Sequence, residues 1–385
     1  MQYRTFGKTG FEASALGFGA MRLPTTDAGG VDEPLAVEMI RTAIDGGVNY
    51  VDTAWPYHGG QSEKVLGKAL QGGYREKVRL ATKLPSWAVE TAEDCDRFLT
   101  EQLERLGTDR VDVYLLHCIN RAFWAKLAKA GALAWADRAL ADGRIGALGF
   151  SYHDDGEFFR EVVDARDWAM CQIQYNLVCE DVQAGTEGLK YAAGKGLAVV
   201  VMEPLFGGTL ARPPEPIRAL YEKAGRDPVD AALQWLWDKP EVACVLSGMS
   251  TIQQVLQNLA SAERSAVGSL SEADRALIAR VQAAYREFSP IPCTKCGYCM
   301  PCPHGVDIPR NFELYNNGAV FSGNALNLCK NLYKQLPDGA RAADCVQCGT
   351  CEAKCPQQIQ ITEWLPKVDA ALNPPTPQTA NRSEA

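Results

Sequence analysis

The chain has 385 residues, of which 46% are hydrophobic and 22% charged, so it can bury a large core and is neither disordered nor fibrous. Its 39 Lys and Arg residues against 47 Asp and Glu give a formal charge of -8, so nothing in the charge favours nucleic acid or an anionic membrane as a partner. The first residues form no apolar signal region, and no apolar run reaches the roughly 18 residues of a membrane span. We expect a cytoplasmic protein whose ligands are small molecules.

Eight short apolar runs alternate with amphipathic stretches between Ala15 and about Ser261. Several runs are rich in β-branched residues, as buried parallel strands are. The runs cover residues 15–20, 48–54, 78–84, 111–117, 145–151, 170–176, 197–203 and 242–248. Eight strand-helix units in about 250 residues predict a (β/α)8 TIM barrel. An open doubly wound sheet is the alternative, but its Gly-rich turn is missing after the first run.

The composition changes abruptly after the segment Ser289-Pro290-Ile291-Pro292, which we interpret as a domain boundary. We predict a barrel over residues 1–288, with residues 3–14 forming a hairpin that closes its floor. A small, mainly helical domain should cover residues 289–368 and contain the two cysteine runs. Residues 369–385 are Pro-rich and polar, which predicts a disordered tail.

Eight of the fourteen cysteines crowd into two short runs, a pattern that indicates metal ligation in a reducing compartment. The runs are Cys293, Cys296, Cys299 and Cys302, then Cys345, Cys348, Cys351 and Cys355. The second run is C-x2-C-x2-C-x3-C-P, the spacing of a bacterial ferredoxin with two 4Fe-4S clusters, in which the fourth cysteine ligates the other cluster. The first run is one residue shorter.

This spacing predicts two 4Fe-4S clusters with crossed ligation. The first would be bound by Cys293, Cys296, Cys299 and Cys355, and the second by Cys302, Cys345, Cys348 and Cys351. Two zinc sites are the alternative, although zinc motifs usually present cysteines in separated pairs. Cys329, between the runs, is expected to be a small buried side chain rather than a ninth ligand. The region resembles a helical dicluster ferredoxin domain.

Four titratable residues lie at or just beyond the ends of consecutive predicted strands: Asp52, Tyr57, Lys83 and His117. The carboxyl ends of barrel strands converge on one face, so these side chains can meet around one substrate. A tyrosine hydroxyl is a poor acid near neutrality, and a neighbouring lysine ammonium can stabilise its phenolate. Asp52 would hold that ammonium, and a neutral His117 would orient a carbonyl oxygen. Each residue alone could be structural, but the four together indicate that a C=O is polarised and protonated.

The first 280 or so residues resemble the aldo-keto reductase family. The matching segments are YRTFGKTGFEASALGFGAMRLP, DTAWPY, ATK, LERLGTDRVDVYLLH, GFS, QIQYN and EPLFGG. The family's catalytic Tyr, Lys, Asp and His correspond to Tyr57, Lys83, Asp52 and His117. The resemblance implies hydride transfer from a nicotinamide to a carbonyl, with Tyr57 as the general acid.

The resemblance also implies a set of dinucleotide contacts. Ser151 and Gln172 would hold the carboxamide, and Gly19 and Met21 would lie near the nicotinamide ribose. Leu205, Gly207, Ser247 and Gly248 would line the pyrophosphate, where backbone and hydroxyl donors suit a phosphate.

Three positions depart from the family pattern. Tyr152 stands where many relatives have an Asn, and Met202 stands where an aromatic ring usually stacks on the nicotinamide. The basic residue that often binds the adenosine 2'-phosphate aligns with Gln254, four positions before Asn258. A neutral amide cannot replace a guanidinium against a dianion, so we expect little or no preference for NADPH over NADH.

These features predict an oxidoreductase that reduces a small-molecule carbonyl or oxidises an alcohol with NAD(P)H, and whose clusters exchange electrons with a ferredoxin or flavoprotein partner. Clusters move one electron at a time and nicotinamide moves two as hydride, so something must split the pair. A flavin is not excluded. The alternative is a barrel acting alone or as a regulatory subunit, with clusters that are structural or redox-sensing.

Overall fold

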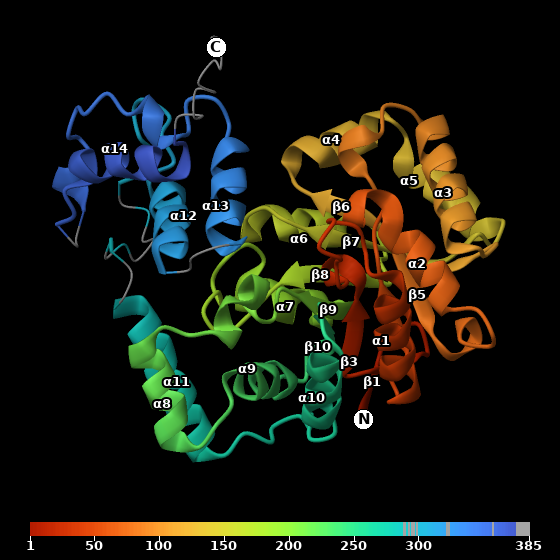
Figure 1. The fold of residues 1–385 in the computed structure, drawn as a ribbon. Helices are drawn as coiled ribbons and strands as arrows, with labels where there is room; N and C mark the ends of the chain where they lie inside the picture. Colours follow the sequence, from red (N-terminus) through yellow and green to blue (C-terminus); the bar gives the residue numbers. More distant parts are fainter. Residues whose placement is uncertain are drawn as a thin grey trace, which may run out of the picture. The chain divides into compact units, whose positions relative to one another are not determined.

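The computed structural model describes residues 1–287, 290–291, 293, 297, 299–320, 324–355 and 358–374. These residues form two compact units (Figure 1). The first contains Met1–Leu205 and Arg226–Arg275, and the second contains Phe206–Gly225 and the chain from Ala276 onward. This division differs from the predicted boundary at 288/289, because the segment that follows strand β9 packs in the second unit.

The first unit is a closed barrel of eight parallel strands in the order β10-β3-β4-β5-β6-β7-β8-β9. The strands are β3 (Leu16–Gly19), β4 (Tyr50–Asp52), β5 (Arg79–Leu84), β6 (Val111–Ile119), β7 (Ile145–Tyr152), β8 (Met170–Gln174), β9 (Ala198–Met202) and β10 (Val242–Ser247). Each coincides with one of the predicted apolar runs. The predicted (β/α)8 architecture is therefore confirmed.

Strands β1 (Tyr3–Thr5) and β2 (Glu12–Ser14) pair antiparallel and form the expected N-terminal hairpin. The hairpin carries Phe6 into the barrel core, where its ring lies 5.2 Å from that of Tyr50. The Arg4 guanidinium donates hydrogen bonds to the carbonyls of Trp237, Lys239, Val242 and Ser265. It thereby satisfies carbonyls of two segments, residues 237–242 and Ser265, with one side chain.

Helices surround the barrel, and six of the nine in the first unit begin at a side chain that caps them. Those of the first unit are α1 (Glu33–Asp45), α2 (Gln61–Ala69), α3 (Ala92–Leu106), α4 (Arg121–Lys129), α5 (Ala132–Ala141), α6 (Gly156–Asp164), α7 (Gly185–Gly194), α9 (Pro228–Trp237) and α10 (Ile252–Ala262). Thr91 and Asp94 form a capping box at the start of α3, and Gly107 ends that helix with a φ of 64°. Such fixed ends set the loops that follow each strand.

The second unit is mainly helical, as predicted. It contains the short helix η5 (Phe206–Ala211), α8 (Glu215–Ala224), most of α11 (Glu272–Glu287), α12 (Ile308–Val320), α13 (Asn324–Lys334) and α14 (Ile361–Leu372). Helices α12, α13 and α14 contact one another, and η5 contacts α13. Helix α14 continues through the first four residues of the predicted tail, and residues 375–385 lie outside the described chain.

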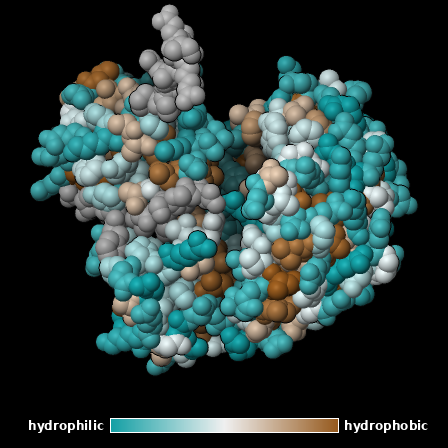
Figure 2. Space-filling view, viewed as in Figure 1, coloured by the Kyte–Doolittle hydropathy of each residue, from teal (hydrophilic) through white to brown (hydrophobic). Residues whose placement is uncertain are grey.

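Hydrophilic residues predominate on the face of the molecule in Figure 2, with hydrophobic residues scattered among them. Among the described helices, none combines the length and the hydrophobicity that crossing a bilayer requires. No disulfide joins the described cysteines.

Candidate active site and cluster-binding segments

Strand alternation places the catalytic candidates in the barrel interior. Tyr50 and Ala81 belong to the barrel core, and Asp52 and Lys83 follow them by two residues, so they point to the same side of the sheet. His117 extends the same inward row on β6. Because the strands are parallel, these ends lie at the carboxyl face, where barrels carry their functional groups.

Lys83 is the centre of this group and is fully buried. Its Nζ donates hydrogen bonds to Asp52 Oδ1 at 2.5 Å and to the Thr53 carbonyl at 2.7 Å. The Tyr57 hydroxyl lies 3.4 Å from the same nitrogen. Tyr57 comes from η2 (Tyr57–Gly60), a turn rather than a strand. The structure therefore brings Asp52, Lys83 and Tyr57 into one chain of polar contacts.

The pKa of Tyr57 is raised to about 12, because burial outweighs the stabilising charge of Lys83. Lys83 thus lowers the pKa of the phenol, as expected, while burial raises it by more. Burial favours the neutral amine of Lys83, yet Asp52 and Tyr57 oppose it and raise the Lys83 pKa, so the ammonium stays charged. Burial likewise raises the pKa of Asp52, and Lys83 opposes that rise.

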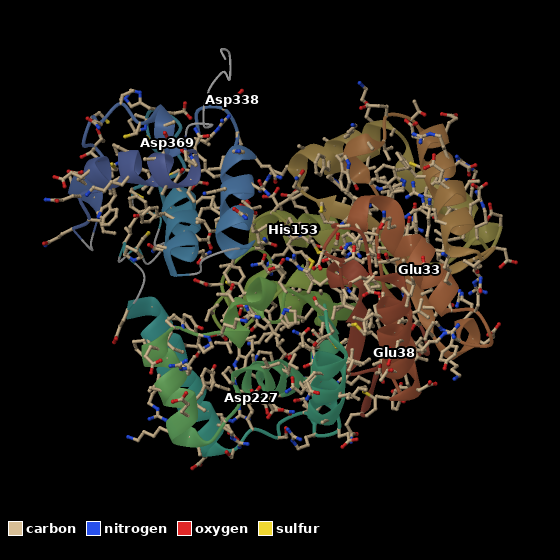
Figure 3. The ribbon with its side chains drawn as sticks, in the orientation of Figure 1. Glu33, Glu38, His153, Asp227, Asp338 and Asp369 are labelled. Carbon is tan, nitrogen blue, oxygen red and sulfur yellow. The ribbon has the colours of Figure 1, made fainter. Side chains whose placement is uncertain are left out.

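His117 completes the group on the other side of Tyr57, with the two rings edge to face at 6.0 Å. Burial, the charge of Lys83 and the nearby His153 lower the His117 pKa well below its usual value, so the ring is neutral as expected. His153 follows the end of β7 (Figure 3). His117 Nδ1 has no hydrogen-bond partner within the described chain. The Trp87 ring lies 5.2 Å from His117 and makes one wall beside it apolar.

The residues predicted to hold a carboxamide lie together on neighbouring strands. Ser151 on β7 is paired in register with Gln172 on β8. Gln172 is 2% exposed, its Nε2 lies 3.6 Å from Met202 Sδ, and its Oε1 finds no partner among the residues described. Ser151 Oγ accepts a hydrogen bond from the Cys118 amide at 2.8 Å, which holds a residue with a φ of 58° beside His117.

A second group of predicted contacts meets where β3 and β10 end. Asn258 donates a hydrogen bond of 2.9 Å from Nδ2 to Ser247 Oγ, and both side chains are buried. A Cβ on Gly19 would lie 3.5 Å from the Ser247 carbonyl, and one on Gly248 would collide with the Arg22 side chain. Backbone is therefore exposed for close approach at Gly248, whereas Gly19 is buried.

Other predicted contacts are more dispersed. Met21, in η1 (Ala20–Arg22), is 49% exposed. Leu205 ends the first stretch of the barrel unit, whereas Gly207 belongs to the second unit. The amide oxygen of Gln254 accepts a hydrogen bond from the Ser250 backbone at the start of α10. Tyr152 is fully buried and donates to the Asp155 carbonyl, so it is a packing residue.

Sequence reasoning missed a buried acid, Glu203, which directly follows β9 with a φ of 56°. Its Oε2 is buried and has no hydrogen-bond partner in the described part of the chain. Burial raises its pKa, and the charge of Arg22 opposes that rise. The segment EPLFGG contains the residue, but the family resemblance marks only its neighbours. A charged residue directly after an all-apolar strand was the available signal.

The described cluster cysteines gather on one hydrophobic core in the second unit. Cys351 is buried in this core, and five others pack against it: Cys293, Cys299, Cys302, Cys345 and Cys355. Cys348 is exposed, and Cys296 lies outside the described residues. Cys329 on α13 is 2% exposed, in agreement with its expected burial.

Thiols from the two cysteine runs lie close together in the second unit. Burial raises the pKa of Cys351, and the nearby thiols of Cys345 and Cys302 add to the rise. Cys302 of the first run therefore lies near Cys351 of the second. The Gln347 amide donates a hydrogen bond of 3.4 Å to Cys345 Sγ, a contact of the kind that tunes cluster potentials. No described group of three or more His, Cys, Asp or Glu side chains is arranged to hold a single metal ion.

A closed parallel barrel with buried titratable groups at the carboxyl ends of its strands, followed by a cysteine-rich helical unit, defines an oxidoreductase architecture. Residues 15–275 match the family model for the aldo/keto reductase family, and residues 292–360 match that for a 4Fe-4S dicluster domain. The chain belongs to the aldo/keto reductase family and carries a C-terminal 4Fe-4S dicluster domain. It is thus an iron-sulfur oxidoreductase of that family.

Among curated proteins, L-galactose dehydrogenase of Arabidopsis thaliana is 31% identical over 288 residues, which cover 68% of this chain and 88% of that protein. The aldo-keto reductase YhdN of Bacillus subtilis is 38% identical over 132 residues, but these span only 38% of its length and 30% of this chain. The oxidoreductase YrpG of Bacillus subtilis is 25% identical over 309 residues, covering 69% of this chain and 92% of that protein.

Among solved structures, the holo form of an aldo-keto reductase from Bacillus halodurans is similar, with a TM-score of 0.62 and 26% identity. An aldo-keto reductase from Klebsiella pneumoniae in complex with NADPH gives a TM-score of 0.61 and 25% identity. In both cases the match covers 73% of this chain and 96% of the other.

The buried Lys83–Asp52 pair yields a stability prediction. Asp52→Leu leaves the Lys83 ammonium buried without a counter-charge and should lower the free energy of unfolding by about 3–5 kcal/mol. Adding Lys83→Met should recover most of that loss, because the site is then apolar throughout. Urea unfolding of the two single variants and the double variant measures the coupling. Asp167→Leu, which breaks the exposed Lys8–Asp167 pair, is the control and should change little. Additive losses at Asp52 and Lys83 would contradict the coupling.

Proposed function

We propose that this protein reduces a small-molecule carbonyl, or oxidises the corresponding alcohol, with Tyr57 as general acid or base. The observation that carries the proposal is the single nitrogen, Lys83 Nζ, that lies 2.5 Å from Asp52 Oδ1 and 3.4 Å from the Tyr57 hydroxyl. The relatives include both a reductase and a dehydrogenase, in accord with a reaction that runs in either direction.

In this proposal Tyr57 donates its proton to the carbonyl oxygen as the carbonyl carbon receives a hydride. Lys83 stabilises the phenolate that remains, and Asp52 keeps Lys83 charged and in place. A neutral His117 orients the carbonyl oxygen through a ring N–H. The high pKa of Tyr57 keeps the phenol protonated throughout the neutral range, so the acid is always ready in the reducing direction.

A bound nicotinamide dinucleotide would supply the hydride. The buried oxygen of Gln172, which has no hydrogen-bond partner among the described residues, fits an amide N–H donor such as the carboxamide, and Ser151 would bind beside it. Gly19, Ser247 and Gly248 would receive the ribose and pyrophosphate, since bare backbone at strand ends suits phosphate. Met21, Leu205, Met202 and Asn258 of the first unit complete the proposed contacts, and the assignment of Gly207 rests on the family resemblance alone.

We further propose that the eight cysteines of the two runs bind two 4Fe-4S clusters that exchange single electrons with a ferredoxin-like or flavoprotein partner. The ligand sets are those of the crossed assignment. Cys348 is exposed, and Val346, two residues before it, is 59% exposed. This exposure supports an electron exit at the loop that contains both residues. A flavin, from the partner or bound to this protein, would convert between one-electron and two-electron transfer.

A second candidate function has its own support. Six of the cluster cysteines pack on one apolar core, which suits clusters that stabilise the fold or sense redox conditions while the barrel acts alone. The two candidates differ in whether the barrel and the clusters share electrons.

Tyr57→Phe removes the acid and keeps the ring. It should lower kcat for carbonyl reduction by at least about a hundredfold, with dinucleotide affinity nearly unchanged. In the unaltered protein the reduction rate should stay level from about pH 6 to 9, because Tyr57 loses its proton only as pH rises through its raised pKa and His117 is already neutral. Steady-state kinetics and fluorescence titration of the dinucleotide provide the measurements. Surviving turnover in Tyr57→Phe would show that the acid lies elsewhere.

Coenzyme preference depends on Gln254. The protein should bind NADH and NADPH with similar dissociation constants, and Gln254→Arg should favour NADPH by about tenfold or more, because a guanidinium can pair with the 2'-phosphate. Gln253→Arg adds the same charge one residue away on the same exposed turn and should shift the ratio less. A hundredfold NADPH preference in the unaltered protein would contradict the assignment.

Electron sharing can be measured directly. Adding NAD(P)H without air to the protein as purified should bleach the cluster absorbance, given a flavin or flavoprotein to split the electron pair. Unchanged clusters alongside continuing carbonyl turnover would favour the structural or sensing role instead. Tyr57→Phe serves as a comparison, since it should bleach as the unaltered protein does.

A further inference from the structure

Two buried asparagines on α12 bind the backbone segments that lead into the two cysteine runs. Asn311 is fully buried and Asn316 is 8% exposed. They lie five residues apart, on different sides of the helix. Among the described residues, neither asparagine makes a hydrogen bond to another side chain. Each instead makes at least two hydrogen bonds to main-chain groups.

Asn316 binds both main-chain groups of Ile291. Its Oδ1 accepts from the Ile291 amide at 3.0 Å, and its Nδ2 donates to the Ile291 carbonyl at 2.7 Å. The Cys293 amide donates to the same carbonyl at 2.7 Å. Ile291 is fully buried outside any helix or strand, so without Asn316 its amide would be costly to leave unpaired. The start of the first run is thereby fixed to α12.

Asn311 joins two other segments. Its Nδ2 donates to the carbonyls of Asp307 at 2.7 Å and Ala340 at 2.8 Å, and its Oδ1 accepts from the Ala342 amide at 2.8 Å. The Asp307 amide also donates to the Ala340 carbonyl at 3.0 Å. Asp307 follows Cys302 by five residues, and Ala342 precedes Cys345 by three. Crossed ligation assigns Cys302 and Cys345 to the same cluster, and Asn311 ties together the segments that carry them.

A further contact reinforces the second segment. The Tyr333 hydroxyl on α13 accepts from the Ala343 amide at 3.2 Å and donates to Asp369 Oδ1 on α14 at 2.8 Å. Figure 3 labels Asp369 on that helix. The segment that leads into the second run is therefore attached to all three helices of the core, whereas Asn316 on α12 holds the segment that leads into the first run.

We propose that Asn316 and Asn311 are positioning residues, each of which fixes segments that carry ligands of one cluster, so that each controls the retention and the reduction potential of that cluster. Asn316 serves the cluster bound by Cys293, Cys296, Cys299 and Cys355, and Asn311 serves the other. Only a carboxamide both donates and accepts at this length, so Leu keeps the volume and loses every hydrogen bond, and Asp loses the donor. This inference rests on the proposed filling by two clusters.

The test uses the full-length protein purified without air. The unaltered protein should contain about eight irons per chain. Asn316→Leu and Asn311→Leu should each retain about half of that iron, and the EPR spectrum of the reduced protein should change from that of two interacting clusters to that of one. Cys293→Ser and Cys348→Ser supply reference spectra. Asn316→Leu should match Cys293→Ser, and Asn311→Leu should match Cys348→Ser.

Asn317→Leu is the matched control, since it makes the same change one residue along the same helix at a half-buried position. It should retain both clusters. Asn316→Asp and Asn311→Asp are milder and should keep their iron while shifting the potential of one cluster in a redox titration. Loss of both clusters together in each Leu variant, or full retention in both, would overturn the inference. Fewer than about eight irons in the unaltered protein would instead overturn the two-cluster filling, so the two failures are distinguishable.

Discussion

The ammonium of Lys83 is the charge on which the barrel site depends. A fully buried lysine would discharge unless a carboxylate and other acceptors surround it, and here Asp52 and the Thr53 carbonyl do so. The pairing requires β4 and β5 to be neighbours in register, which the closed barrel provides. Tyr57 then meets a fixed positive charge although it comes from a turn. The fold therefore places the ion pair, and the charge of that pair acts on the Tyr57 phenol.

Much of this site follows from alternation along strands. Asp52, Lys83 and Gln172 each lie two residues beyond a core side chain, so the apolar runs predict that they point inward. Tyr57 lies on a turn with no periodicity, and only the family resemblance identifies it. The net shift of its pKa depends on how burial, which raises it, compares with the charge of Lys83 at 3.4 Å, which lowers it. Neither quantity can be read from the sequence.

Other features could not be predicted for physical reasons. Helix α8 follows a Pro-rich stretch that reads as a loop, although proline in the first turn is compatible with a helix. The asparagines of α12 look like ordinary polar residues on a helix of mixed composition. Their importance appears only when segments 25 to 31 residues away are brought against them. Glu203 likewise stands out only because its carboxyl group is buried, which the sequence does not show.

The path of the chain between the two units has a practical consequence. The backbone crosses from one unit to the other at 205/206, at 225/226 and at 275/276. A protease would need cuts at all three junctions to release either unit intact. A shortened chain ending near residue 288 would keep η5 and α8 but lack α13, the helix against which η5 packs. Such a fragment would expose an apolar face in the middle of its sequence, and it is a poor substitute for the whole protein.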